Sequence, residues 1–369
     1  MFKFNNNEDF INMLSLGVDL DLDTVNSQKV DFRKSLGKIQ AKSRKDAKGE
    51  ECFYCGEKCS SFCNSHSIPA FFLRNIAVDG DVYNNNKLVS FPLLDEDKGV
   101  NNTGTFQLIC RDCDSKIFSD YENPDNYQNT PTSKMIAQIA MKNSLKSIAK
   151  RKFEIALYTN MKNDMAFPND FYEQRQLINH LDLKEYIEDF NKAKRIEKKG
   201  WDNEYYLFYH QKLDYVVPIA FQSNIALVID FKGSIINDIY NKSSNYKIQS
   251  MHICVFPLET SSIIMMFVDS KHKRYRSFYK QFKKLTPQDK LAAINYIIFS
   301  YSEDVYINKE VNEEVLQDTG LIDASRKGFD VLSTQPTVDA EMIGRENLDF
   351  SEINSIPNLL SEEFKIQQL

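Results

Sequence analysis

Two pairs of cysteines constrain this chain more than any other feature of its sequence. Cys52 and Cys55 stand in CFYCGEKCSSFCNSHSIP (residues 52–69), and Cys110 and Cys113 stand in CRDC. A CxxC pair on a tight turn presents two sulfur atoms to one ion, and zinc in structural sites takes four tetrahedral ligands, often thiolates. Gly56 suits such a turn, because glycine reaches positive φ at little steric cost. The two pairs therefore predict one complete structural Zn²⁺ site.

Two further cysteines, Cys59 and Cys63, lie between the pairs. Together with Cys55 and His66 they could form a different ligand set or hold a second ion. The alternative, which we favour, is that Cys59 and Cys63 are small buried residues, because free cysteine is commonly buried in proteins.

The composition restricts the class of protein. With 369 residues, 42% of them hydrophobic and 27% charged, the chain has the make-up of a soluble globular protein of two or three domains. No secretory signal opens it, and no apolar run reaches the roughly 18 residues that a membrane span needs. These features predict a cytoplasmic protein without membrane contact, in which CxxC pairs bind metal rather than form disulfides. The net charge of −6 confines any nucleic-acid surface to local patches.

The texture of the sequence predicts an α+β protein in four parts. Residues 1–50 are an N-terminal arm with a basic linker, since seven Lys or Arg and one acid fall between Arg33 and Lys48; the alternative is that this run contacts phosphates. Residues 51–131 carry the cysteines. Residues 132–311 read as helices around a mainly antiparallel sheet. Residues 312–369 are acidic and predict a flexible tail.

One local pattern resembles a known family. SHSIP between two CxxC pairs, with a strand ending at the second pair and a helix after it, resembles the zinc-containing branch of the HNH or His-Me finger (ββα-metal) endonucleases. Three parts match: the pair Cys52 and Cys55, His66 with Ile68 and Pro69, and the pair Cys110 and Cys113. The resemblance covers about 70 of the 369 residues. It implies a small zinc-knuckle ββα, treble-clef-like domain ahead of the larger α+β domain.

The resemblance also implies roles. His66 would be the general base that takes a proton from water, and Asp114 would bind a catalytic Mg²⁺ or Mn²⁺ on the scissile phosphate. Helical spacing would place Glu122 on the same face as Asp114, as a further ligand of that cation. Two positions depart from the family pattern, because Ser65 stands where the first metal-binding residue is expected and Thr105 stands where asparagine is usual.

The expected function is therefore metal-dependent endonuclease activity on nucleic acid, DNA in preference to RNA. A nuclease of this kind in a bacterial host would fit phage defence or a mobile element. The alternative is a non-catalytic, zinc-stabilised module for binding nucleic acid or protein. Ser65 and Thr105 favour this alternative, and Asp114 could equally be a helix N-cap.

A second basic segment, KHKRYRSFYKQFKK (residues 271–284), interleaves cations with aromatic residues. Its candidate nucleic-acid contacts are Lys273, Arg274, Arg276 and Lys280, with neighbouring rings stacking on bases. The alternative is an amphipathic helix that buries the aromatic residues at 275, 278, 279 and 282 and leaves its basic side in water.

Overall fold

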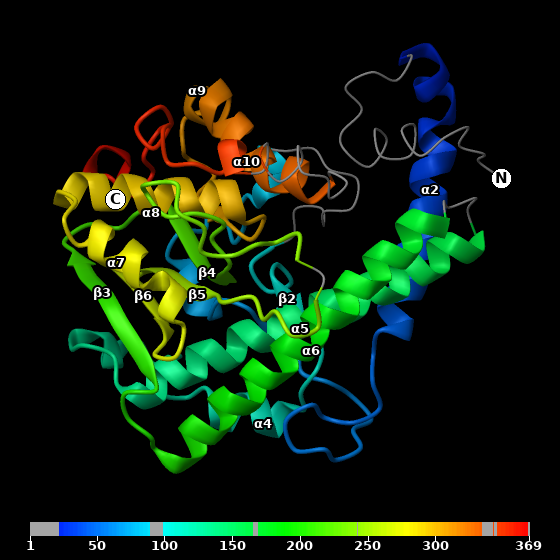
Figure 1. The fold of residues 1–369 in the computed structure, drawn as a ribbon, viewed down its shortest axis with the longest axis horizontal. Helices are drawn as coiled ribbons and strands as arrows, with labels where there is room; N and C mark the ends of the chain where they lie inside the picture. The colour runs from blue at the N-terminus through cyan, green and yellow to red at the C-terminus, as the bar shows by residue number, and fades with distance from the viewer. Residues whose placement is uncertain are drawn as a thin grey trace.

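The computed structural model describes residues 22–88, 99–164, 169–241, 243–333, 342 and 345–367. Long helices lie beside an antiparallel sheet, which confirms the α+β class (Figure 1). The helices of the N-terminal half are α2 (Leu22–Asp46), α3 (Ala70–Arg74), η1 (Asn85–Lys87), α4 (Arg111–Ile117), η2 (Pro124–Gln128), α5 (Ser133–Asp164) and α6 (Asn169–Lys199). Those of the C-terminal half are η3 (Lys273–Tyr275), α7 (Arg276–Phe282), α8 (Pro287–Tyr301), α9 (Glu313–Leu316), α10 (Thr319–Ser333) and η4 (Glu362–Phe364).

The part of the chain at residues 51–131 is here called the cysteine unit, and its described residues (51–88 and 99–131) contain little regular structure. Its two strands, β1 (Ser65–His66) and β2 (Thr105–Phe106), form a short antiparallel pair in which His66 lies opposite Thr105. Helix α4 follows β2 directly. Helix α3 and η1 lie between the two strands, so the order of described elements here is β1–α3–η1–β2–α4.

The sheet unit (residues 205–307) is built around five antiparallel strands in the order β3–β6–β5–β4–β7. The strands are β3 (Tyr205–Leu213), β4 (Ile219–Ile225), β5 (Met251–Pro257), β6 (Ser262–Asp269) and β7 (Tyr306–Ile307). Strands β5 and β6 are buried almost throughout, because both faces of the sheet are covered.

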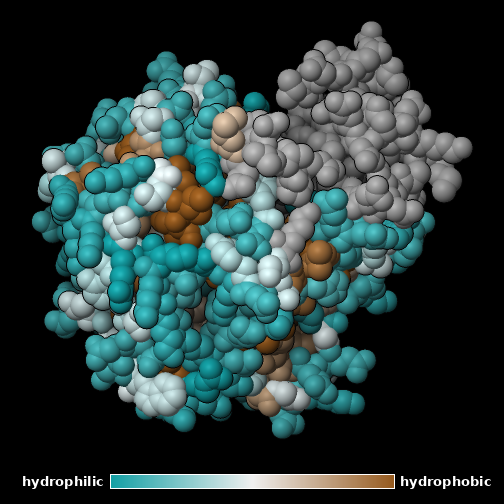
Figure 2. Space-filling model, viewed as in Figure 1, coloured by the Kyte–Doolittle hydropathy of each residue, from teal (hydrophilic) through white to brown (hydrophobic). Residues whose placement is uncertain are grey.

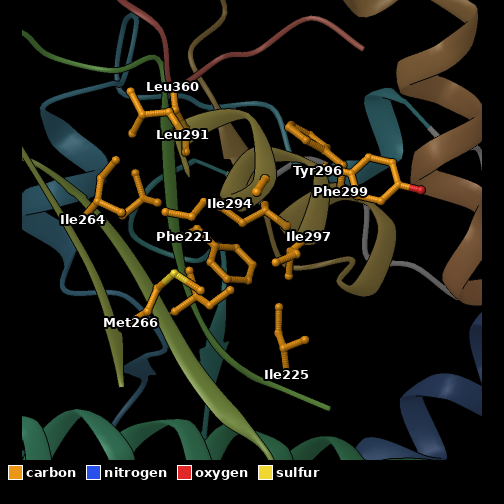
Figure 3. Packing of buried hydrophobic residues seen from close by; sticks show 14 of the residues in the cluster. Phe221, Ile225, Ile264, Met266, Leu291, Ile294, Tyr296, Ile297, Phe299 and Leu360 are labelled. Atoms are coloured by element: carbon orange, nitrogen blue, oxygen red, sulfur yellow. The ribbon is translucent and has the colours of Figure 1, made fainter. Parts of the chain in front are cut away.

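The alternation of side chains along β6 divides the interior into two cores. Ile264 and Met266 face α7 and α8, where they pack with Phe221 and Ile294 (Figure 3). Ile263, Met265 and Phe267 face the other way, toward the cysteine unit and α5. The cysteine unit therefore shares its core with one face of the sheet.

One aromatic pair marks this shared core. The ring of Phe72 on α3 stacks on that of Phe256 on β5, with centroids 4.3 Å apart and planes 5° apart. Nearby, the Asn75 side chain donates a hydrogen bond to the Pro257 carbonyl oxygen at 2.9 Å. The contact between the two units is thus both apolar and hydrogen-bonded.

Helices α5 and α6 form a long pair that runs beneath the sheet, and α2 packs against α5 (Figure 1). Helix α5 is buried on most of its circumference, so polar residues such as Lys142 and Asn143 are enclosed along with its apolar ones. A helix with this placement loses the usual separation into an apolar face and a polar face.

Two segments differ from the sequence expectation. The basic linker is part of helix α2, because Leu36 and Ile39 bury one side of it against the body of the protein. The predicted flexible tail contributes core residues, and Leu321, Leu359 and Leu360 are fully buried. The apolar residues of this acidic segment pack into the same core as α8, so the acidic composition did not indicate its burial.

Candidate metal centre and the adjoining lysine–carboxylate cluster

The four predicted cysteine ligands come together. The sulfur atoms of Cys52, Cys55, Cys110 and Cys113 all lie within 4.8 Å of one another. Zinc–sulfur bonds of about 2.3 Å in a tetrahedron place neighbouring sulfur atoms about 3.8 Å apart, so this donor set fits one metal ion. We call these four residues the cysteine tetrad.

Local backbone geometry builds the tetrad. The Gly56 N–H donates to the Cys52 carbonyl oxygen at 2.8 Å, and Gly56 adopts a φ of +79°, as its position after the first CxxC predicts. Cys110 is the N-cap of α4, so Cys113 stands in the first helical turn and turns back toward Cys110. The Cys110 N–H donates to the Cys52 sulfur at 3.3 Å.

Backbone donors also prepare Cys52 for metal binding. Burial by itself would raise the pKa of this thiol, but backbone N–H groups around it stabilise the thiolate and lower its pKa to about 7. The thiolate is the form that binds metal.

Cys59 and Cys63 lie outside the tetrad, and both are half-buried. Cys59 contacts the Glu57 carbonyl oxygen at 3.4 Å. The Cys63 thiol donates to Asp114 Oδ2 at 3.3 Å, and burial together with this carboxylate raises its pKa to about 11. Cys63 therefore stays protonated and acts as a hydrogen-bond donor to Asp114.

A second cluster lies beside the tetrad and is centred on a residue that the sequence reasoning missed. Lys142 of α5 places its Nζ 3.0 Å from Ser65 Oγ, 3.0 Å from Asp114 Oδ1 and 3.1 Å from Glu122 Oε1. The same Nζ lies 3.7 Å from the centroid of the Phe118 ring. The Lys142 side chain is 1% exposed. We call Ser65, Asp114, Glu122 and Lys142 the lysine–carboxylate cluster.

The two carboxylates of this cluster respond differently to Lys142. Burial would raise the pKa of Asp114, but the Lys142 charge and the Ser65 hydroxyl, which donates at 2.5 Å, hold it below its usual range. At Glu122 burial outweighs the attraction of Lys142, and the pKa is raised. Helix α4 ends at Ile117, so Glu122 reaches the cluster from the turn after the helix and not from the helical face that was expected.

His66 stands next to Ser65 but makes a separate contact. Its Nε2 lies 3.0 Å from the Val100 carbonyl oxygen, and burial lowers its pKa. The neutral ring therefore donates through Nε2–H and keeps Nδ1 as an acceptor. Because successive side chains of a strand point to opposite faces, His66 and its neighbour Ser65 point in opposite directions from β1. Among the described residues, His66 accordingly has no hydrogen bond to Asp114 or Glu122.

Three of the four aromatic residues at positions 275, 278, 279 and 282 are not available to nucleic-acid bases, and Tyr279 is half-buried. Tyr275, Phe278 and Phe282 are fully buried in the core, as the amphipathic alternative predicts. Lys273, Arg276 and Lys280 are exposed, whereas Arg274 lies over the Tyr246 ring at 4.7 Å and contacts the backbone of residue 247.

The basic run before the cysteines forms a more continuous surface. Exposed lysines at 34, 38, 42 and 45 of α2 fall within an arc of about 80° at 100° per residue. Beyond the helix, Lys48 and Lys58 line an open pocket of about 640 Å³ next to Cys59. We call this surface the α2 lysine stripe. It leads directly into the cysteine unit.

Comparison of the chain with protein-family models, with curated proteins and with solved structures gives no match. No helix in the described ranges is long and apolar enough to cross a membrane. The face seen in Figure 2 is mostly hydrophilic, with small apolar areas.

Proposed function

We propose that this chain is a zinc-stabilised, HNH-like module that binds nucleic acid, DNA in preference to RNA, without cutting it. The observation that carries the proposal is the cysteine tetrad, which stands beside the short β1–β2 pair and at the start of α4. Zinc is the metal that four thiolates in a tetrahedral site favour. Metal analysis of the purified chain is expected to find zinc, lost when Cys113 is changed to serine.

The α2 lysine stripe supports nucleic acid as the partner. Its cations are exposed on one helix face and continue to Lys48 and Lys58 at the edge of the cysteine unit. A row of cations on a rigid helix suits the phosphate backbone, which is recognised by charge and without base contacts.

Salt-dependent DNA binding tests this assignment. Lys38→Gln/Lys45→Gln is expected to weaken binding to duplex DNA and to reduce the slope of log K against log salt by about 2, since each lost phosphate contact removes about 0.9. Lys273→Gln/Lys280→Gln removes the same charge from η3 and α7 and is the matched control. Equal effects of the two double variants would show nonspecific attraction, and absence of binding by the native chain would overturn the proposal.

A second candidate is the metal-dependent endonuclease. The convergence of Asp114 and Glu122 on one point, next to the strand that carries His66, favours it. In this case His66 would be the base and the two carboxylates would hold Mg²⁺ or Mn²⁺. This candidate ranks second because the ammonium group of Lys142 already lies between these carboxylates.

Cleavage of supercoiled plasmid and of single-stranded DNA separates the two candidates. The binding module predicts no nicking with Mg²⁺ or Mn²⁺. Nicking by the native chain that disappears in His66→Ala, with zinc content unchanged in that variant, would establish the endonuclease instead. Measuring zinc in both proteins distinguishes a lost base from a lost fold.

A further inference from the structure

The lysine–carboxylate cluster carries an inference about metal selectivity. We infer that the ammonium group of Lys142 is the resident cation of this cluster and excludes a divalent cation from it. The native chain then holds metal at the cysteine tetrad alone among the described sites, and replacing Lys142 with a neutral residue opens an oxygen-ligand site for Mn²⁺ or Mg²⁺.

The contacts of Lys142 saturate its hydrogen-bonding capacity. A lysine ammonium has three N–H donors, and Nζ has three oxygen partners, on Ser65, Asp114 and Glu122, at 3.0–3.1 Å. The Phe118 ring covers a further side at 3.7 Å. With the side chain 1% exposed, the ammonium is enclosed and its position is fixed.

The oxygen partners are of the type that a hard divalent cation binds. Carboxylates and hydroxyl groups suit Mg²⁺ and Mn²⁺. A cation about 2.1 Å from the same oxygens would stand too close to Nζ for both charges to fit. The ammonium and a divalent cation therefore compete for one position.

The charges of the cluster favour a divalent cation once the ammonium group of Lys142 is removed. Asp114 and Glu122 together carry two negative charges around one ammonium, and Asp114 also accepts hydrogen bonds from the Ser65 hydroxyl and the Cys63 thiol. Without Lys142 the carboxylates of Asp114 and Glu122, whose side chains are 19% and 32% exposed, would face each other with no cation between them. Their mutual repulsion is unfavourable, and a divalent cation would relieve it.

Replacement of Lys142 by methionine tests the inference in the zinc-loaded full chain. Methionine keeps the length of the side chain and removes the charge. Lys146→Met is the matched control, because Lys146 lies one turn further along α5 and pairs with Asp304 instead. Mn²⁺ binding is measured by electron paramagnetic resonance and by the shift in melting temperature.

We expect Lys142→Met to bind Mn²⁺ at least about tenfold more tightly than the native chain or Lys146→Met. Mn²⁺ is expected to raise the melting temperature of Lys142→Met alone, and adding Asp114→Asn to this variant is expected to abolish both effects. Mn²⁺ binding by the native chain that is lost in Asp114→Asn would overturn the inference. A folded Lys142→Met that binds no Mn²⁺ would also overturn it.

Lys142→Gln is the second variant, since it removes the charge and keeps a polar, hydrogen-bonding side chain. If both variants are insoluble without Mn²⁺ and soluble with it, the inference is supported. If both stay insoluble with Mn²⁺ while Lys146→Met is soluble, the inference fails. The inference shares one premise with the proposed function, namely that no catalytic cation binds at this cluster. Mn²⁺ binding is measured in the absence of DNA, so failure of this inference can be distinguished from failure of DNA binding.

Discussion

The cysteine unit and the sheet unit reach a defined structure by different means. Strands β1 and β2 have two residues each, whereas β3, β4, β5 and β6 have 9, 7, 7 and 8 residues. The sheet unit has extended ladders and apolar residues on both faces. The cysteine unit has the cysteine tetrad, which is positioned to hold a metal ion, and a core that it shares with the sheet. With so little regular structure of its own, we expect the cysteine unit to depend on a bound metal ion and on this neighbouring core.

Removal of the metal should produce the largest difference in stability between the cysteine unit and the sheet unit. In Cys113→Ser, or in the native chain with a zinc chelator, we expect residues 51–131 to unfold, because zinc contributes about 10–16 kcal/mol of apparent binding free energy in small zinc domains. We expect β5 and β6 to keep their protection, which hydrogen exchange followed by mass spectrometry would measure. Simultaneous exchange of both regions would show that the two units unfold as one.

The shared core provides the next largest test. Phe256→Ala should lower the free energy of unfolding by about 3–5 kcal/mol, since it removes a buried ring and leaves a cavity against Phe72. It should also speed zinc release to a chromogenic chelator. Phe221→Ala, on the opposite face of the sheet, is the matched control: it should cost similar stability with zinc release unchanged while the protein is folded. Similar release rates in the two variants would contradict the shared core.

The free energy of unfolding of the sheet unit should fall more steeply with decreasing pH than an exposed histidine would cause. His252 on β5 is 8% exposed and accepts a hydrogen bond from the Asn143 side chain at 3.0 Å. Burial lowers its pKa from 6.5 to about 3. The folded state therefore keeps the ring neutral while the unfolded chain takes up a proton below pH 6.5, so stability is present above that pH and is lost as the pH falls toward 3.

At pH 5 the loss attributable to His252 should be about 2 kcal/mol relative to pH 7, at 1.36 kcal/mol for each pKa unit. Urea unfolding at several pH values would measure it. His252→Gln should unfold with a smaller pH slope between 6.5 and 5, although it is less stable at pH 7. An unchanged slope would show that other groups account for the acid sensitivity.

Substitution of two glycines by alanine should give the smallest changes in stability, with opposite signs. Gly56 has a φ of +79°, so Gly56→Ala should destabilise the cysteine unit by about 1–2 kcal/mol. Gly37 lies inside α2 with no atom within 4 Å of an added Cβ, so Gly37→Ala should stabilise the chain by about 0.5–1 kcal/mol. Thermal unfolding would show shifts of opposite sign. A shift of the same sign in both would indicate that one of the two backbone assignments is wrong.

The features that the sequence predicted well depend on neighbours close along the chain. Each CxxC pair spans four residues, and Gly56 completes the turn within the next position. The strands were likewise predicted from short β-rich runs of adjacent residues. Glu122 was predicted to lie near Asp114 on one face of a helix. It does lie near Asp114, but helix α4 ends at Ile117, so the turn after the helix places it there.

The features that were missed depend on distant segments. Lys142 falls at helical spacing among Met135, Ile139 and Leu145, where its neighbours are core residues. That placement was the available signal that it is buried, but nothing local indicated its partners. Ser65 lies 77 residues away from it and Asp114 lies 28 residues away.

The grouping of the four cysteines and the antiparallel sheet could be predicted from the sequence, because ligand spacing and strand composition are local properties of the chain. The tertiary structure was needed to show that an ammonium group lies between Asp114 and Glu122, that Leu359 and Leu360 belong to the core, and that Tyr275, Phe278 and Phe282 face inward. The physical reason is that burial and charge pairing depend on which surfaces meet, and the meeting of α5 with the cysteine unit is set by the packing of the whole chain.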